Sequence, residues 1–242
     1  GLRVVIFEKD RFGEACSAHN CGYICPSHVL PLTEPGAVAT TLRGMLNPNS
    51  PFSVKMRLDF RLAYWFLRFS LRCNDADMME GARAIQPLLT SSMELYRQLT
   101  AEQKLACEWQ EKGLLYVYRS MEKFDAYTKT ERLLRKRFNE PAVRIEGKAL
   151  LELEPSLRSG LAGAWHYEGD AHLRSDLLMD SWKDFLQRKG VEIRENCAFS
   201  GIRETEDEVL ADSTEGEIKA MHVVVATGAL TPRLGRILGW RA

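Results

Sequence analysis

The chain has 242 residues, 45% of them hydrophobic, which is enough for one large domain or two modest ones with a real core. Lysine plus arginine and aspartate plus glutamate number 33 each, and this balance argues against a nucleic-acid partner. No apolar run approaches the roughly 20 residues that a membrane-spanning helix needs, and the first residues do not have the pattern of a signal peptide. We therefore expect a cytoplasmic protein that is at most peripheral to a membrane.

Six cysteines stand at positions 16, 21, 25, 73, 107 and 197. The first three follow a C-x4-C-x3-C spacing, which matches neither the paired C-x2-C of structural zinc nor the common iron–sulfur patterns. We expect small buried thiols in a reduced cytoplasm and no metal site. A metal or redox site is the alternative.

A buried parallel strand is predicted at the start of the chain. An apolar run follows Gly1 and ends at Glu8. In dinucleotide-binding folds, a carboxylate at this point accepts hydrogen bonds from the adenosine ribose, and a Gly-x-Gly-x-x-Gly turn lies roughly 20 residues upstream. That turn would fall before Gly1, so we expect the sequence to be truncated at its front. The alternative is that Glu8 is an ordinary acid at the end of a strand.

A loop of small and polar residues follows at 15–27. Its composition would let backbone amides approach a phosphate or a flat ring, with Ser17 and Asn20 offering side-chain hydrogen bonds. A plain surface loop with a serine cap is the alternative. The prolines at 26, 31 and 35 and Gly36 predict an extended, non-helical continuation.

Residues 58–71 have the pattern of a basic, aromatic-rich amphipathic helix. Its apolar residues at 58, 62, 65, 66 and 69 share one face, and arginines interrupt the pattern at 57, 61, 68 and 72. Such a helix can lie in a membrane interface. More often a helix of this kind packs on its own core, and the pattern alone leaves both alternatives open.

The elements after this helix suggest a second, inserted domain. We predict helices at 77–103, broken near Pro87, and at 124–138 and 147–153, with strands at 113–118 and 143–146. This mixture differs from the strand pattern at the two ends of the chain. The expected division is therefore a first part at 1–49, an inserted substrate-type domain at 50–165, and a second part at 166–242.

The last part returns to the strand pattern after a loop and a helix. The loop at 163–173 mixes aromatic residues, histidines and acids, as pocket-lining loops do, and the helix after it has Ser175 as its predicted N-cap and Gly190 just past its end. A three-stranded antiparallel meander is predicted at 198–220. A β-branched run at 223–228 then ends in Thr227 and Gly228, where a backbone could pass close to a ligand. We expect this run and the first strand to be neighbours in one nucleotide-binding sheet.

This order of elements resembles the D-amino acid oxidase superfamily of flavoproteins, and within it most of all the D-amino acid dehydrogenases. The most specific stretch runs from Ser17 to Pro26, which is similar to that family's Ser-x-x-Asn-x-Gly-x-x-x-Pro segment. The resemblance covers nearly the whole chain, although residues 50–155 match in layout more than in sequence. It implies an α/β fold with an incomplete Rossmann-like FAD-binding sheet, an α+β insert and an antiparallel meander.

The resemblance also implies roles for particular residues. The cofactor-binding residues would be Glu8, Lys9, Ser17, Asn20, Gly22, Phe199, Thr227 and Gly228. Substrate candidates are His166, Tyr167 and His172. No metal is implied, and no residue is singled out as catalytic. The phosphate-binding glycine turn and the substrate-carboxylate arginine would lie outside this sequence, so the chain by itself is expected to bind flavin poorly and to be inactive.

The activity that the resemblance implies is oxidative deamination of D-amino acids. Hydride passes from the α-carbon to FAD, and a quinone or another carrier accepts the electrons. A related amine oxidase or dehydrogenase, acting on glycine, sarcosine or D-proline derivatives, is the first alternative. A non-catalytic piece that cannot hold flavin is the second. Residues 58–71 would give any peripheral contact with the inner face of a membrane.

Overall fold

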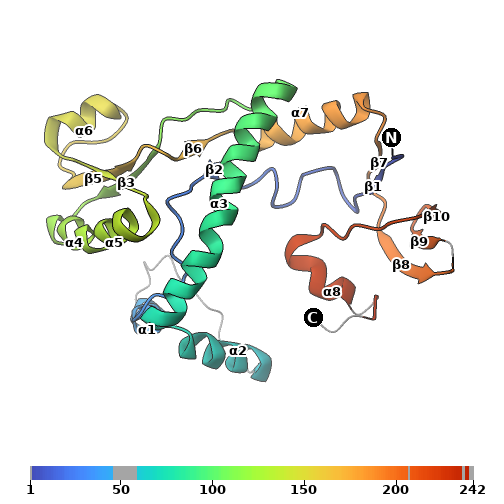
Figure 1. Ribbon diagram of the computed structural model, residues 1–242, viewed down its shortest axis with the longest axis horizontal. Coiled ribbons are helices and arrows are strands. Elements are labelled where there is room, and N and C mark those ends of the chain that lie inside the picture. Colours follow the sequence, from blue (N-terminus) through green and yellow to red (C-terminus); the bar gives the residue numbers. More distant parts are fainter. Residues whose placement is uncertain (1, 46–58, 207, 236–237, 240–242) are drawn as a thin grey trace. The chain divides into compact units, whose positions relative to one another are not determined.

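A computed structural model describes residues 2–45, 59–206, 208–235 and 238–239 (Figure 1). The chain divides into two compact units. The terminal unit comprises Gly1–Cys21, Gln103–Glu108 and Arg174–Ala242, and the central unit comprises Gly22–Glu102 and Trp109–Leu173. Both contain helices and strands, as the predicted mixed α/β class requires.

The elements of the central unit are mostly helices with short strands between them. They are β2 (Tyr23–Ile24), α1 (Ala37–Met45), α2 (Phe60–Leu71), α3 (Asp75–Gln103), β3 (Leu114–Tyr118), α4 (Met121–Ala126), α5 (Thr128–Phe138), β4 (Val143–Ile145), α6 (Gly147–Leu153), β5 (Gly163–Tyr167) and β6 (Ala171–His172). The strands predicted at 113–118 and 143–146 and the helix predicted at 147–153 are confirmed. Helix α1 was not expected, since the proline-rich sequence before it predicted extended backbone.

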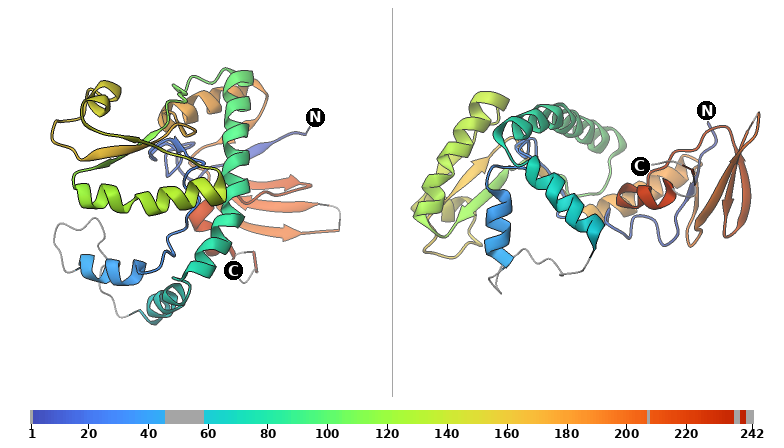
Figure 2. Two further views of the ribbon diagram at one scale, coloured as in Figure 1. Left: turned by 60° about the vertical axis from the view of Figure 1, so that its left-hand side comes forward. Right: turned by 90° about the horizontal axis from the view of Figure 1, so that it is seen from below.

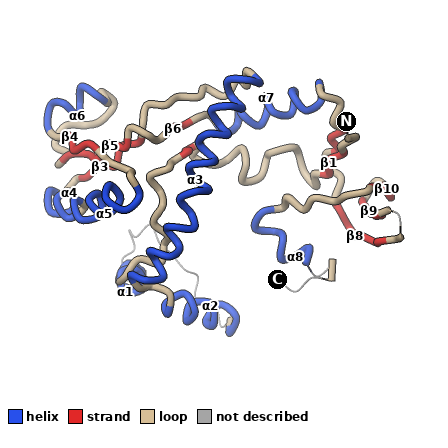
Figure 3. Tube along the Cα trace, in the orientation of Figure 1, coloured by secondary structure: helices blue, strands red, loops and turns tan. Residues whose placement is uncertain are grey.

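The core of the central unit forms against a three-stranded antiparallel sheet of order β3-β5-β4. In the central strand β5, Trp165 pairs with Tyr116 on one side and with Arg144 on the other. Helices α4 and α5 lie beside this sheet (Figure 3). Phe124 of α4 is fully buried in the cluster that contains Trp165, and truncating such a residue costs roughly 3–5 kcal/mol.

Two helix predictions in this unit were wrong in detail. Helix α3 runs unbroken through Pro87, because buried Ala82 before the proline and buried Met93 after it hold both halves against the core. The helix predicted at 124–138 is instead two helices, which meet at Tyr127. The Tyr127 ring stacks on Tyr116, so core packing fixes the break at this residue.

The terminal unit contains the predicted first strand and the predicted meander. Its elements are β1 (Val5–Phe7), α7 (Ser175–Arg188), β7 (Glu192–Arg194), β8 (Phe199–Glu204), β9 (Val209–Ser213), β10 (Gly216–Ala220), the 3-10 helix η1 (Gly228–Leu230) and α8 (Thr231–Gly235). Strand β1 pairs in parallel with β7, with Ile6 opposite Ile193. The parallel strand predicted from the apolar run before Glu8 is therefore confirmed, but its residues are half-buried and not buried as expected.

The strand predicted at 223–228 does not form. Residues 222–227 are irregular, Val224 is 86% exposed, and the parallel partner of β1 is β7. A β-branched run becomes a strand only where a neighbour supplies hydrogen bonds and one face is covered. Neither condition holds for this run within the described residues.

Ser175 does not cap α7 as predicted. The N-cap is Arg174, and the Ser175 hydroxyl donates instead to the carbonyl oxygens of Ala18, at 2.9 Å, and Asn20, at 3.0 Å. Two carbonyls of the preceding loop thus compete successfully for the hydroxyl. The end of the helix agrees with the prediction, since Gly190 follows its last turn with a φ of +80°.

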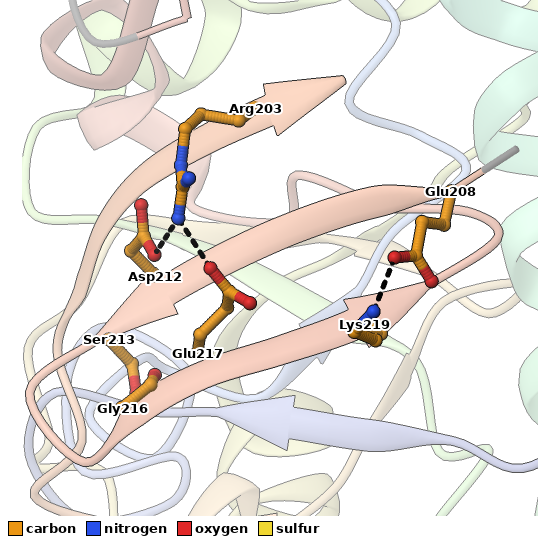
Figure 4. Close-up of polar contacts among 7 residues, drawn as sticks. All are labelled: Arg203, Glu208, Asp212, Ser213, Gly216, Glu217 and Lys219. Atoms are coloured by element: carbon orange, nitrogen blue, oxygen red, sulfur yellow. Dashed lines mark hydrogen bonds and ion pairs between the residues drawn. The ribbon is translucent and has the colours of Figure 1, made fainter. Parts of the chain in front are cut away.

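The meander is held in register by side chains on its surface. The left view of Figure 2 shows its three strands side by side. Their order in the sheet is β10-β9-β8. Figure 4 shows Arg203 of β8 reaching Asp212 of β9, at 3.2 Å, and Glu217 of β10. Lys219 of β10 binds Glu208 at 2.7 Å. These pairs are exposed, so they favour this register over others more than they add stability.

None of the helices in the described part of the chain combines the length and the apolar character needed to cross a membrane.

Gly22, at the start of the central unit, permits a close backbone contact that no other residue type allows. Its φ is +66°, and a Cβ there would stand 2.0 Å from the carbonyl oxygen of Leu173. Gly36 has a φ of +85° but open space around the same position.

Gly36→Ala should lower the free energy of unfolding by about 1 kcal/mol, for its left-handed backbone alone. Gly22→Ala should lower it by a further 1–3 kcal/mol, because a backbone oxygen cannot move aside. Urea unfolding of the two variants measures the difference. Equal losses would contradict the contact.

Candidate functional site

Glu8 leaves the end of β1 with its backbone fixed on both sides. Its N–H donates to the Arg194 carbonyl at 2.9 Å, and its carbonyl accepts the N–H of Cys197 at 2.9 Å. Its carboxylate Oε1 accepts one hydrogen bond, from the Asp10 N–H at 3.1 Å. A carboxylate has about four acceptor positions, so this one can still receive the two hydroxyls of a ribose.

Lys9 is placed beside Glu8 but faces solvent. Its Nζ lies 3.1 Å from Asp10 Oδ2, and the side chains of Lys9 and Asp10 are each 60% exposed. An ion pair this exposed contributes little to stability. Lys9 could exchange Asp10 for an anionic ligand at small cost.

Ser17 and Asn20 are brought together in one turn. The Asn20 side-chain amide donates to the Ser17 carbonyl at 2.7 Å and to the Cys16 carbonyl at 3.1 Å. The Ser175 hydroxyl then ties this turn to the first residue of α7. In this structure the Asn20 amide therefore shapes the loop, and a ligand beside the loop would meet its exposed outer surface.

The cysteines around this loop differ from the prediction of buried thiols. Cys16 and Cys21 are exposed, Cys73 is half-buried, and only Cys25, Cys107 and Cys197 are buried. No disulfide joins any two of the six. The described residues contain no cluster of histidine, cysteine and acidic side chains that could hold a metal ion. The exposure of Cys16 and Cys21 is not what the apolar character of cysteine predicts.

Asp170 is a buried acid that the sequence did not single out. It lies in the turn between β5 and β6 and is only 1% exposed. Its Oδ2 accepts the Ser27 hydroxyl at 2.6 Å, and its Oδ1 accepts the Ser27 N–H at 3.1 Å. Burial raises the pKa of Asp170, while the Ser27 hydrogen bonds lower it again in part. The only sequence signal was an acid beside a glycine and between two apolar strands.

The three substrate candidates occupy different positions in the central unit. Tyr167 is buried, and its hydroxyl lies 2.9 Å from that of Tyr127; burial raises the pKa of Tyr167 to about 12. His166 bonds through Nε2 to the Lys112 carbonyl at 2.9 Å. His172 pairs with Tyr23 in the β2–β6 ladder. Because side chains alternate along a strand, His166 and Tyr167 face opposite sides of β5.

The remaining cofactor candidates lie in the second half of the terminal unit. Phe199 opens β8 opposite Ser213. Thr227 precedes η1, with its Oγ1 3.1 Å from Thr231 Oγ1, and Gly228 has a φ of +51° with open space where a Cβ would stand. Neither strand pairing nor a hydrogen bond joins Thr227 or Gly228 to β1 within the described residues.

Two surface hollows lie along α3, and neither is lined by a candidate residue. One is lined by Gln86, Pro87, Thr90, Ser91, Glu94 and Leu95, and the other by Thr33, Arg72, Asp77, Glu80, Gly81 and Ala84. The candidate site therefore rests on the end of β1 and the loop that follows it.

Comparison with known proteins identifies the family. The family model described as DAO, FAD dependent oxidoreductase, matches residues 1–240. The chain belongs to this family. The DAO assignment agrees with the fold, in which Glu8 follows a parallel strand and a meander follows later in the chain.

Relatives and solved structures are similar over almost the whole chain. D-amino acid dehydrogenase 2 of Mesorhizobium japonicum is 27% identical over 99% of this chain and 59% of its own length, and D-amino acid dehydrogenase of Helicobacter pylori is 26% identical over 95% and 55%. Glycine oxidase from Geobacillus kaustophilus superposes with a TM-score of 0.67 at 23% identity, over 98% of this chain and 52% of its own. Iminodiacetate oxidase from Chelativorans sp. gives 0.63 at 18%, over 100% and 53%. The chain thus spans a little more than half the length of these DAO-family proteins.

The residues at the end of β1 fit the adenosine part of FAD. Glu8 has spare acceptor positions beyond its one bond to Asp10, and its backbone is held by two hydrogen bonds. Two ribose hydroxyls can donate hydrogen bonds, and a carboxylate held at a rigid strand end can accept both. The fit concerns the adenosine part alone.

Asp170 gives a testable link between pH and stability. Its folded-state pKa is raised above the ordinary 3.8, so the folded protein binds this proton more tightly than the unfolded chain does. The contribution of Asp170 to the unfolding free energy should therefore fall as the pH rises through 3.8 and then through the raised pKa. Urea unfolding should show the wild type losing stability relative to Asp170→Asn as the pH rises above the ordinary carboxyl value of 3.8.

Asp170→Ala should also destabilise at every pH, by about 1–3 kcal/mol, because it leaves the buried Ser27 groups without an acceptor. Asp180→Asn, on the exposed side of α7, is the control and should leave the stability unchanged. A flat difference between the wild type and Asp170→Asn would contradict the assigned direction of the pKa shift.

Proposed function

We propose that this chain forms part of an FAD-dependent oxidoreductase that deaminates D-amino acids oxidatively. The observation that carries the proposal is a parallel strand pair with Glu8 fixed at its end, in a chain that the DAO family model matches over 1–240. The D-amino acid dehydrogenases among its relatives favour this substrate class.

In this proposal the chain contributes binding and orientation. FAD, when bound, supplies the chemistry by accepting a hydride from the α-carbon of the amino acid. The Glu8 carboxylate accepts hydrogen bonds from the adenosine ribose, and Lys9 adds positive charge nearby. Ser17, Asn20 and Gly22 line the pyrophosphate and the approach to the ring. Holding the Cα–H bond in line with its acceptor is the main requirement, since no strong acid or base is needed.

Later residues complete the proposed arrangement. The Phe199 backbone meets the adenine, and Thr227 and Gly228 border the cofactor through a backbone with room around it. His166 and His172 are the proposed substrate contacts. Tyr167 would act through its hydroxyl pair with Tyr127, which orients the core face of β5.

A quinone or another electron carrier is the proposed acceptor. The protein would work in the cytoplasm, with peripheral contact at the inner membrane face through residues 58–71, of which α2 forms the described part. This location would bring the reduced cofactor near a lipid-soluble acceptor.

A second candidate function is oxidation of a related amine such as glycine, sarcosine or a D-proline derivative. The structural similarity to glycine oxidase and to iminodiacetate oxidase, with TM-scores of 0.67 and 0.63, favours it. The two candidates differ in the acceptor. A dehydrogenase reduces a quinone or dye and makes little peroxide, whereas an oxidase forms peroxide from oxygen. A third candidate, a piece that cannot hold flavin, predicts a colourless protein.

Glu8→Gln tests the cofactor site. It keeps the shape of the side chain but removes the charge that strengthens two ribose hydrogen bonds, so the affinity for FAD should fall by about 10- to 100-fold. Titration of FAD into the cofactor-free full-length protein, followed at the flavin band of about 450 nm, measures this. Glu14→Gln removes an exposed acid of the same loop and should leave the affinity unchanged. Equal FAD affinities of the Glu8→Gln and Glu14→Gln variants would show that Glu8 does not bind the cofactor.

Steady-state assays with the full-length protein test the substrate class. D-amino acids should reduce a quinone analogue or dye, while L-enantiomers and glycine should react at least tenfold more slowly. Peroxide should stay a minor product. Rapid peroxide formation from glycine or sarcosine would instead establish the second candidate.

A further inference from the structure

Helix α2 of the central unit is well formed although none of its residues is buried. Asp59 caps its start by accepting the backbone N–H groups of Arg61, at 2.9 Å, and Leu62, at 3.2 Å. The N–H of Arg72 closes its end on the carbonyls of Phe69 and Ser70. Local capping, more than core packing, therefore defines these helix ends.

One face of α2 carries a continuous exposed apolar stripe. Phe60, Tyr64, Leu67 and Leu71 follow the spacing i, i+4, i+7 and i+11, which aligns side chains along a single side of a helix. Their exposed fractions are 92%, 60%, 57% and 70%. Large apolar residues scattered singly on a surface need no explanation, but four in one line do.

The charges beside this stripe have one sign. Arg61 follows Phe60 and Arg68 follows Leu67, so both arginines lie on the same flank of the stripe. Both are exposed, and neither has an acidic partner among the described residues. The Arg68 guanidinium lies 5.8 Å from the centre of the Tyr64 ring. Residues 60–71 contain no acid at all, in a chain whose total charge is zero.

The sign of this flank distinguishes between the surfaces that could cover the stripe. A second copy packed antiparallel on this face would bring the arginine flanks of the two helices together, which like-charge repulsion disfavours. An anionic lipid surface would receive the arginines with its head groups and the stripe with its acyl boundary. Tyr64 and the neighbouring Trp65 are of the residue types that favour this boundary.

We propose that the exposed face of α2, formed by Phe60, Tyr64, Leu67 and Leu71 with Arg61 and Arg68, binds the surface of an anionic lipid bilayer. The helix lies in the plane of the interface, since it is too short and too charged to span it. The proposed function places a peripheral membrane contact at residues 58–71, and the proposal for α2 rests on it for that location alone. Lipid binding itself needs no flavin.

Sedimentation with lipid vesicles tests this proposal. The full-length protein, with and without FAD, is spun with vesicles of phosphatidylcholine alone or of phosphatidylcholine and phosphatidylglycerol at equal amounts. We expect binding at least tenfold stronger to the anionic vesicles, weakened by added salt. Binding should be the same with and without FAD, so failure of the flavin proposal would leave this result intact.

Two pairs of variants identify the face. Phe60→Ser with Leu67→Ser removes half of the stripe, and Arg61→Gln with Arg68→Gln removes its charge; each pair should weaken binding about tenfold or more. The matched controls are Leu88→Ser with Leu95→Ser, exposed leucines seven residues apart on α3, and Arg83→Gln with Arg132→Gln, exposed arginines of α3 and α5. Circular dichroism checks that every variant keeps its helical signal and melting temperature.

Each outcome decides the matter. Loss of binding in the α2 variants alone, with the controls unchanged, supports the proposal. Absence of binding to anionic vesicles, equal binding to both kinds of vesicle, or equal loss in the controls would overturn it. So would light scattering that shows a dimer which the Phe60→Ser, Leu67→Ser pair dissociates, because a second copy would then cover the stripe.

Discussion

The parallel pairing of β1 with β7 is the constraint on which the candidate site depends. Parallel strands cannot be joined by a tight turn, so the chain must travel away from β1 and return before the pair can form. The return runs through α7, and the final step is the short connection from Gly190 to Glu192. The pairing then fixes Glu8 through the Arg194 carbonyl and the Cys197 amide. A carboxylate on a free chain end would have no fixed direction, whereas this one has.

A second closure holds the ends of the central unit together. Strand β2 near its start pairs with β6 near its end, and the buried Ser27–Asp170 contact reinforces this pairing. Closing a long stretch of chain costs entropy that grows only slowly with its length, so a few good contacts suffice. Gly22 belongs to the same closure, because its lack of a Cβ lets the Leu173 carbonyl approach. A residue proposed for the cofactor thus also has a structural reason to be glycine.

The sequence was informative wherever local chemistry decides the structure. Gly190 marked the end of α7, Glu206 and the residues of 214–216 marked the turns of the meander, and the apolar run before Glu8 marked a parallel strand.

Predictions failed where contacts between residues distant in sequence decide the structure. Pro87 should have broken α3 but sits between buried anchors, and Ser175 found carbonyl acceptors in a loop far away in sequence. The run at 223–228 had strand propensity but no neighbour. Asp170 was missed because only its burial beside Ser27 makes it important.

The alternation of β5 limits how the substrate candidates can act. Trp165 and Tyr167 are two residues apart and share the face that packs on Phe124 and Tyr127, so that face is filled by the core. His166 stands on the opposite face, where its ring already lies against the Gly113 backbone and bonds to Lys112. A substrate that met Tyr167 would have to displace core aromatic rings, whereas one that met His166 would have to break only a single hydrogen bond. In the proposed function, β5 therefore meets the substrate through His166, and the Tyr127–Tyr167 pair holds the strand that presents it.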